Sequence, residues 1–364
     1  MYRVNRDIFF VFTPEGEFAV WDYRNHLQFS LTSEYFQKIC ECAKNDLDES
    51  SLDEVANDLI REGILLPIDS EIDKCEWKWD VLSRIFHVGT SATGRPTGEG
   101  TPNAAERARS YVERCDSILE QMPDDTFMTE RGFQKMALPA VGTCKDRTPL
   151  IDILAARKTS RSFTGESLAA NDISMILTET FSYREHSHEH YNARGLVVPA
   201  KRRSSPSGGS LQVSEAYLVA LNVDGIARGV YHYRSHDNEL ALVSEIPDDL
   251  MMGTQFLFEQ AFSNDASAFI IITSRFEKMW WKYPASRAYR VANIDVGHLS
   301  QTALLLATEL GMNTWLTAAF VDEDVRDFLK IEPLSAEYPM LVLGFGTGAY
   351  DPVDKNYFPA VTEA

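Results

Sequence analysis

The chain has 364 residues, of which 44% are apolar and 11% aromatic, so it is expected to be globular and to bury a large core. Its formal net charge is −19, and residues 1–80 alone carry eight Lys/Arg against eighteen Asp/Glu. This acidity argues against nucleic acid and anionic membranes as partners and would suit a basic peptide better. The first residues, MYRVNRDIFFVF, lack the cleavage site of a signal peptide, and no uncharged apolar run reaches about 18 residues, so we expect a cytoplasmic protein without a membrane span.

No metal site is expected from the cysteines or the histidines. The cysteines are odd in number and have no CxxC spacing, which argues against a disulfide framework and against a zinc site; they are Cys40, Cys42, Cys75, Cys115 and Cys144. Three alternating histidines, His186, His188 and His190, would share one face only in a strand, and no second set of ligands lies nearby in the sequence. We therefore interpret the histidine segment as an exposed polar loop.

The first 88 residues are predicted to form a small α+β domain. Two apolar-aromatic runs within residues 8–22 flank Pro14-Glu15-Gly16, which indicates a hairpin. Helical spacing follows in residues 33–45, and a second helix is predicted to begin at the capping box Ser51-x-x-Glu54 and to stop at Gly63. A hairpin, two helices and a short terminal strand are the elements of a winged-helix-like domain.

A linker and a larger domain are predicted to follow. Residues 89–104 hold four Gly and two Pro among Thr and Ser, so we expect a linker and connecting helices over residues 89–148. Helices then alternate with strands: the predicted helices cover residues 149–163, 172–181 and 293–311, and the predicted strands cover residues 215–223, 229–234, 266–274 and 338–346. Residues 149–364 are therefore also expected to be α+β, with an antiparallel or mixed sheet flanked by helices.

Basic residues of this larger domain gather in three places, at residues 157–161, 201–203 and 275–290. A phosphate is bound by fixed donors, and Arg beside a Ser or Thr hydroxyl supplies them, so ARKTSR at residues 156–161 is a candidate phosphate site. SSPSGGSL at residues 204–211 holds two adjacent glycines, whose backbone N–H groups can approach a flat ring. The sequence has neither GxGxxG nor a Walker motif, so neither a Rossmann nor a Walker nucleotide site is expected.

Three motifs resemble those of one enzyme family. ARKTSRSF is similar to the RRSxRxF segment of nitroreductase-like flavoproteins, and SSPSGGSL, followed by EAYL and GVYHY, is similar to the PSGGxL stretch of their dehydrogenase branch. Residues 282–312 resemble the KYxxRxYRxxxxxxGHxxQ helix of that branch. The chain thus resembles the SagB-type, or McbC-like, azoline dehydrogenases over residues 150 to 350, which implies a nitroreductase-like FMN-binding fold.

The resemblance implies an enzyme that oxidises thiazoline and oxazoline rings of a peptide to thiazoles and oxazoles with FMN. Carried over by position, it assigns the FMN phosphate and ribityl chain to Arg157, Lys158, Thr159 and Arg161. It places Pro206, Ser207 and Gly208 against the isoalloxazine and Gln301 facing the flavin, and it nominates the backbone N–H groups of Ala318 and Ala319 for flavin N5. Lys282 and Tyr283 match the pair that this branch uses near the substrate.

Two positions depart from the pattern of the family. Thr159 stands where Ser is usual, which preserves the hydroxyl group. Thr347 stands where many relatives place an Arg against the phosphate, so that contact is absent or is made by Lys355 or another cation.

The chemistry of the implied reaction limits where the catalytic pair can lie. Aromatising an azoline removes a proton from one carbon and a hydride from another, so the site needs a base and an acceptor. Tyr283 could be the base if Lys282 or one of the nearby arginines favours its phenolate form. Adjacent residues on a helix do not face each other, so we expect Lys282 and Tyr283 on a loop or at a helix start.

The resemblance also implies a homodimer whose sites form between two chains, and a cyclodehydratase or carrier protein as a partner. The N-terminal domain could bind a basic leader peptide by strand addition, or it could be a dimerisation or scaffold domain. Two alternative functions stay open, an NAD(P)H-dependent nitro- or quinone reductase and an inactive scaffold for a cyclodehydratase. Dependence on nicotinamide would favour the first, and failure to retain FMN would favour the second. The preferred ring, the ribosomal or nonribosomal origin of the peptide and the electron acceptor are not given by the sequence.

Overall fold

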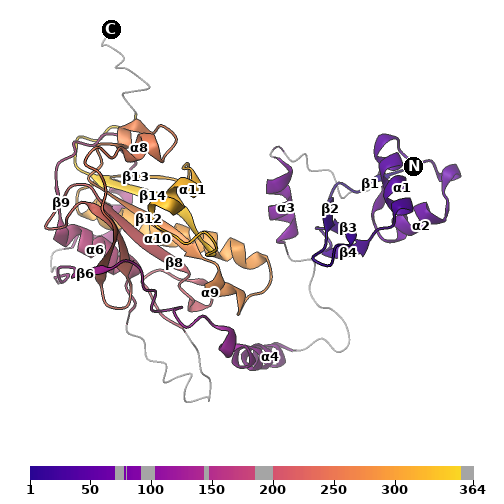
Figure 1. Ribbon diagram of the computed structural model, residues 1–364, viewed down its shortest axis with the longest axis horizontal. Helices are drawn as coiled ribbons and strands as arrows, with labels where there is room; N and C mark the ends of the chain where they lie inside the picture. The colour runs from indigo at the N-terminus through magenta and orange to yellow at the C-terminus, as the bar shows by residue number, and fades with distance from the viewer. Residues whose placement is uncertain (70–77, 79, 92–102, 143–146, 185–199, 354–364) are drawn as a thin grey trace, which may run out of the picture. The chain divides into compact units, whose positions relative to one another are not determined.

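The computed structural model describes residues 1–69, 78, 80–91, 103–142, 147–184 and 200–353. The chain divides into two compact units, Met1–Pro102 and Asn103–Ala364 (Figure 1). The predicted histidine loop, Lys355 and, in the predicted linker region, residues 92–102 and 143–146 lie outside the described residues. Within the described part of the chain, no helix has the length and apolar character needed to cross a bilayer.

The first unit contains a three-stranded antiparallel sheet, a two-stranded antiparallel sheet and helices. Its elements are β1 (Tyr2–Val4), β2 (Ile8–Phe12), β3 (Phe18–Asp22), β4 (Leu27–Ser30), α1 (Ser33–Lys44), η1 (Glu49–Ser51), α2 (Glu54–Arg61), β5 (Leu65–Pro67) and α3 (Val81–Gly89). The sheets have the orders β2-β3-β4 and β1-β5. The predicted hairpin is confirmed, because β2 and β3 pair across a turn in which Gly16 has φ 85°.

The start of α2 differs from the predicted capping box. Ser51 ends the short helix η1, and the cap of α2 is Asp53, whose carboxylate accepts a hydrogen bond from the backbone N–H of Ala56. An aspartate directly before the helix satisfies an amide that would otherwise have no partner, and its charge suits the helix N-terminus. The helix stops where predicted, with Gly63 at φ 73°.

A buried carboxylate connects α3 to the three-stranded sheet. Asp7 is 1% exposed and accepts hydrogen bonds from Tyr23, Arg24 and Arg84, the last of which lies on α3. Burial alone would raise the pKa of Asp7, but the two guanidinium groups and the phenol outweigh it and hold the pKa below the ordinary value. Because its acceptor oxygens are so well paired, Asp7 fixes α3 to this unit.

The second unit is built on a seven-stranded sheet with the strand order β13-β14-β12-β8-β10-β11-β6 and antiparallel pairing throughout. Its strands are β6 (Gln134–Ala137), β8 (Ser214–Ala220), β10 (Gly229–Arg234), β11 (Glu239–Ser244), β12 (Ala268–Arg275), β13 (Asn313–Thr317) and β14 (Glu337–Gly346). Two short strands, β7 (Leu168–Ala169) and β9 (Val223–Asp224), pair in parallel beside it. The strands predicted from apolar runs are therefore confirmed.

Helices and loops cover both faces of this sheet. The helical segments are α4 (Ala104–Ser117), η3 (Leu119–Gln121), α5 (Leu150–Ala156), α6 (Ala170–Phe181), η4 (Gly208–Ser210), α8 (Met252–Gln255), η5 (Ala261–Ser263), α9 (Glu277–Trp280), α10 (Arg287–Glu309) and α11 (Asp322–Phe328). One core joins Ala216, Leu218 and Ala220 of β8 to α6 and α10, and the other core joins Tyr217 and Val219 of β8 to η5 and α11. These five apolar residues alternate between the two faces of the sheet, and all of β8 is buried. The predicted α+β class is confirmed.

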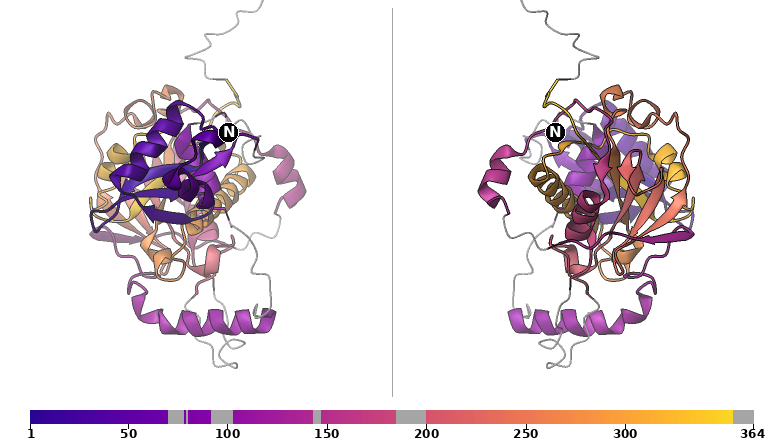
Figure 2. Two further views of the ribbon diagram at one scale, coloured as in Figure 1. Left: turned by 90° about the vertical axis from the view of Figure 1, so that its right-hand side faces the viewer. Right: turned by 90° about the vertical axis from the view of Figure 1, so that its left-hand side faces the viewer.

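Two helices differ in extent from their predictions. The predicted helix 149–163 ends at Ala156, because the next residues run beside the sheet, where the Ser160 N–H donates to the Thr314 carbonyl. The predicted helix 293–311 begins earlier, at Arg287, and ends at Glu309 before Gly311, which has φ 74°. The helix α4 lies outside the layers formed by the sheet and its covering helices, as both views of Figure 2 show.

Candidate functional site

Lys282 and Tyr283 lie in the turn between α9 and α10, so the prediction that they lie off a regular helix is confirmed. The backbone N–H groups of both residues donate to the Met279 carbonyl. Trp281 is buried and its indole N–H donates to the Lys278 carbonyl, whereas Trp280 is 59% exposed. The turn is therefore anchored from inside by Trp281.

The glycine loop lies directly against this turn. Gly209 has φ 61°, and a Cβ atom at this position would be 2.4 Å from the Tyr283 hydroxyl oxygen. The ammonium group of Lys282, which is 7% exposed, donates to the Gly209 carbonyl over 3.4 Å. Burial lowers the pKa of Lys282. Two motifs separated by more than seventy residues thus form one site.

A carboxylate on α10 fixes the glycine loop. Asp295 accepts a hydrogen bond from the Ser207 hydroxyl at 2.6 Å and from the Gly208 N–H at 3.2 Å. Burial raises the pKa of Asp295 above its usual value. The hydroxyl proton of Ser207 is therefore directed at the protein, and the role of Ser207 in this structure is to hold the loop. We did not predict this role for Asp295, although its position in the third predicted helix was visible in the sequence.

The basic cluster at residues 275–290 is divided by the fold. Lys278 is fully buried and paired with Glu215 of β8, which also contacts His232 Nε2 at 3.1 Å. Arg275 is 4% exposed and is paired with Asp125 and Glu277. Burial would raise the pKa of Glu215, but Lys278 and His232 hold the pKa well below its usual value. Lys278 and Arg275 are therefore neutralised inside the protein and are not available to a ligand.

The cluster at residues 201–203 also loses its third cation to the core. Arg203 is 2% exposed, and its guanidinium donates to the carbonyl oxygens of Phe181 and Ser214 and to the Ser235 hydroxyl. Sequence proximity alone cannot separate such a structural arginine from a ligand-binding one, because its acceptors come from distant segments.

The predicted phosphate segment, residues 157–161, lies beside β13 and the end of β14. The Lys158 ammonium lies 3.7 Å from the centre of the Tyr350 ring, and Arg161 donates to the Pro352 carbonyl at 2.6 Å. Neither contact neutralises the cation. Arg157 and Thr159 are half-buried in the same segment. Thr347 stands at the position where the family pattern places an Arg. Its hydroxyl group forms a hydrogen bond with the Thr164 hydroxyl at 2.7 Å.

The phosphate segment and the glycine loop lie toward opposite ends of α10. The loop is held at Asp295, whereas the phosphate segment pairs with β13, which follows the end of α10 at Glu309. Fourteen residues of helix separate Asp295 from Glu309, or about 20 Å at about 1.5 Å per residue. A cofactor site that used both segments of one protomer would have to span this length of α10.

The remaining predicted residues lie on exposed surface. Gln301 is exposed on α10. Ala318 and Ala319 are exposed after β13, and the Ala319 N–H donates to the Thr317 hydroxyl at 2.9 Å. Among the described residues, no group of three His, Cys, Asp or Glu side chains is arranged to hold a metal ion.

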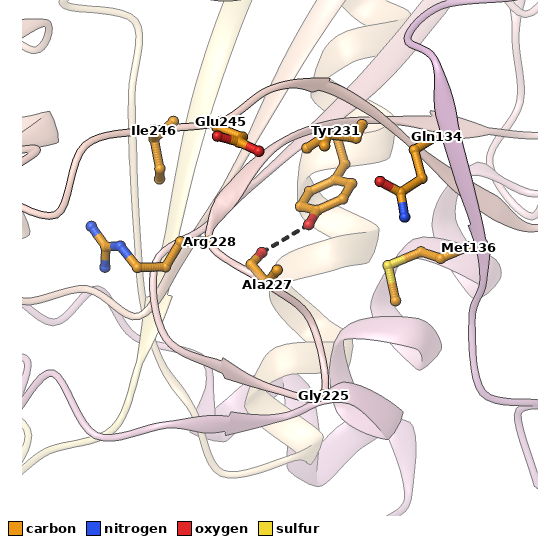
Figure 3. A pocket seen from close by; sticks show the side chains of 9 residues that line it. Gln134, Met136, Gly225, Ala227, Arg228, Tyr231, Glu245 and Ile246 are labelled. Atoms are coloured by element: carbon orange, nitrogen blue, oxygen red, sulfur yellow. Dashed lines mark hydrogen bonds between the residues drawn. The ribbon is translucent and has the colours of Figure 1, made fainter.

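A cavity of about 430 Å³ lies elsewhere, beside β6 and β11 (Figure 3). Its lining contains none of the predicted site residues and is formed by Gln134, Met136, Gly225, Ala227, Arg228, Tyr231, Leu242, Glu245 and Ile246. The Tyr231 hydroxyl donates to the Ala227 carbonyl, and Arg228 donates to the Leu221 carbonyl. Because the cavity contains none of the predicted site residues, we do not assign the site to it.

Comparison with known proteins identifies relatives of the second unit. A model of the nitroreductase family matches residues 154–347. The chain is 29% identical over 199 residues to the nitroreductase-type protein MJ1384 of Methanocaldococcus jannaschii, which covers 54% of this chain and 90% of that protein. The chain is also 29% identical to the trifolitoxin-processing protein TfxB of Rhizobium leguminosarum bv. trifolii, and the match covers 62% of this chain and 60% of TfxB. It is 28% identical to the microcin B17-processing protein McbC of Escherichia coli, covering 40% of this chain and 54% of McbC.

The contact between Gly209 and Tyr283 predicts a pair of coupled substitutions. Gly209→Ala should lower the free energy of unfolding by about 1 kcal/mol through its positive φ and by a further 1 to 3 kcal/mol, roughly, through the clash with Tyr283. Gly225→Ala is the matched control, because Gly225 has φ 77° but an added Cβ would meet nothing within 4 Å. In a Tyr283→Ala background, Gly209→Ala should cost no more than Gly225→Ala. Denaturant unfolding measures all of these variants, and an equal cost of Gly209→Ala in both backgrounds would contradict the contact.

Proposed function

Because the chain belongs to the nitroreductase family, we propose that it is an FMN-dependent oxidoreductase that oxidises thiazoline and oxazoline rings of a peptide to thiazoles and oxazoles. The observation that carries this proposal is the placement of Lys282 and Tyr283 directly on the backbone of the glycine loop. Two similar proteins are named for the processing of trifolitoxin and microcin B17, which supports a peptide substrate.

The residues of the two half-sites fit FMN. Added Cβ atoms at Gly208 and Gly209 would lie 2.2 Å from Val291 and 2.4 Å from Tyr283, so the absence of side chains lets the loop backbone lie against α10 and beside the proposed base. At the other half-site, the cations and hydroxyl of a phosphate site come from Arg157, Lys158, Thr159 and Arg161. Pro206, Ser207, Gly208 and Gln301 would lie near the ring, and Ala318 or Ala319 would offer a backbone N–H. Bound FMN would supply the acceptor for the hydride.

The Lys282–Tyr283 pair would perform the proton chemistry. The Tyr283 hydroxyl lies at Gly209, beside the position proposed for the cofactor ring, so it could take the proton from the substrate carbon. The buried ammonium of Lys282 lies 5.7 Å from the centre of the Tyr283 ring and could orient the azoline through a hydrogen bond. Asp295 would keep the loop in place during the reaction, since it holds both Ser207 and Gly208.

A second copy of the chain would complete the site. The helix α5, which directly precedes Arg157, exposes 62% of Leu150, 71% of Ile151 and 47% of Leu154. Apolar side chains so exposed are typical of a surface covered by a partner. We propose a homodimer in which the phosphate segment of one protomer faces the glycine loop of the other.

The first unit is proposed to recognise the leader segment of the peptide. Its three-stranded sheet has β2 and β4 at its edges, and an edge strand can pair with an extended peptide. The acidic character of residues 1–80 would favour a basic leader. Dimerisation and a scaffold role for a cyclodehydratase or carrier protein are the alternatives for this unit.

The proposed activity predicts a specific spectroscopic response. The purified protein should show the visible absorption bands of a flavin, and these bands should bleach when a thiazoline peptide is added without oxygen. Bleaching should slow by about 100-fold or more in Lys282→Ala, which removes the group that orients the azoline, and in Tyr283→Phe, which removes the group that takes the substrate proton. Bleaching by NAD(P)H but not by the peptide would instead identify a reductase, and a protein without flavin would favour the scaffold.

Subunit complementation tests whether the site is shared between protomers. Arg157→Ala and Tyr283→Phe homodimers should each be nearly inactive. When the two variants are unfolded, mixed and refolded, half of the dimers are mixed, and each would contain one site with both residues intact, so about a quarter of the wild-type activity should return. No recovery, with mixed dimers demonstrated by mass spectrometry, would place both residues of each site in the same protomer.

A further inference from the structure

A second tyrosine contacts the Lys282–Tyr283 pair from a helix that none of the motifs includes. The hydroxyl of Tyr111 on α4 lies 3.1 Å from the hydroxyl of Tyr283. The helix α4 stands apart from the layers of the sheet and its helices (Figures 1 and 2).

The helix α4 is capped at its start and anchored to the protein just after its end. The helix begins with a capping box in which the Asn103 side chain accepts from the Glu106 N–H and the Glu106 carboxylate accepts from the Asn103 N–H. After its end, Ile118, Leu119 and Met122 pack on the cluster that contains Met279 and Trp281. The turn that carries Tyr283 and the helix that carries Tyr111 thus share one apolar cluster.

When both phenols are neutral either can donate, but once Tyr283 is a phenolate only Tyr111 has a proton to donate. Partial burial raises the pKa of Tyr111, whose side chain is 46% exposed, and its contacts with Tyr283 and Cys115 raise it further. Tyr111 therefore keeps its proton over the working pH range and can donate it to Tyr283. A hydrogen bond to a charged oxygen is about twice as strong as one to a neutral oxygen, so the contact gains strength when Tyr283 becomes a phenolate.

We propose that Tyr111 is a positioning residue, which orients the Tyr283 hydroxyl and stabilises the Tyr283 phenolate by donating a hydrogen bond to it. The inference rests on the proposed function, because it assigns the substrate proton to Tyr283. The proton passes from the substrate carbon to the Tyr283 oxygen, while Tyr111 keeps its own proton and no electrons are exchanged between the two phenols. The helix α4, which lies outside the family match, thereby becomes part of the active site.

The other groups around Tyr283 do not replace this donor. From its own turn, the Lys282 ammonium lies 5.7 Å from the ring centre and donates to the Gly209 carbonyl. The glycine loop contributes backbone, since the carboxylate of Asp295 is already engaged by Ser207 and Gly208. The adjoining helices carry charged and titratable groups of their own. On α4, Cys115 is half-buried, and the charged side chains are exposed: Glu106, Arg107, Arg109, Glu113, Arg114 and Asp116. At the start of α10, Arg287 is exposed and Arg290 is half-buried.

The first test reads the phenol itself and needs no reaction. With 3-fluorotyrosine incorporated at position 283 of the full-length protein, the fluorine resonance should titrate with pH. In the Tyr111→Phe variant the midpoint should move up by about 1 pH unit, because the phenolate loses its donor. Tyr338→Phe, which removes a hydroxyl from another partly exposed tyrosine of the same unit, should leave the midpoint unchanged. An unchanged midpoint in Tyr111→Phe would overturn the inference.

The second test uses the pH profile of kcat with a thiazoline peptide. Tyr111→Phe should retain flavin and KM but should lose about tenfold in kcat at pH 7, and raising the pH should restore much of the loss. A loss of kcat that is the same at every pH would contradict the inference and indicate a structural defect. If Tyr283→Phe were fully active, the proposed function would fail instead, whatever the fluorine titration showed.

Discussion

The ion pair between Lys278 and Glu215 is the interaction on which the site depends most. Both side chains are almost completely buried, one on α9 and the other on β8, and the carboxylate also contacts His232. Breaking a buried pair by removing one partner typically costs about 3 to 5 kcal/mol, because the remaining charge has no partner. The pair fixes α9 on the sheet, and the next four residues lead directly into the turn that holds Lys282 and Tyr283.

Two anchors approach the same point from opposite directions. The turn is held from the sheet by Lys278 and Trp281, and the glycine loop is held from α10 by Asp295. They meet at Gly209, where the absence of a side chain lets the Tyr283 hydroxyl reach the backbone. Preorganisation of this kind is what the proposed role of Tyr283 as a base requires, since the geometry of a base must be set before the substrate arrives.

Much of the fold and the positions of the motifs could be predicted from local patterns. The apolar strands, the hairpin of the first unit and the end of α10 just before Gly311 follow from periodicity and turn residues. The electrostatic roles could not be predicted in this way. Lys278 and Arg203 resemble other surface cations in the sequence, because their acceptors lie in distant segments that only the folded chain brings near. Tyr111 was missed for the same reason, since 172 residues separate it from Tyr283.

The central claim is that the chain removes two hydrogen atoms from an azoline ring in a peptide. The most direct measurement is the mass of a thiazoline-containing peptide after incubation with the purified, flavin-containing protein in air, without NAD(P)H. The account predicts a product that is lighter by two hydrogen atoms and carries the ultraviolet absorption of a thiazole. A peptide of unchanged mass, under conditions in which the protein retains its flavin, would contradict it.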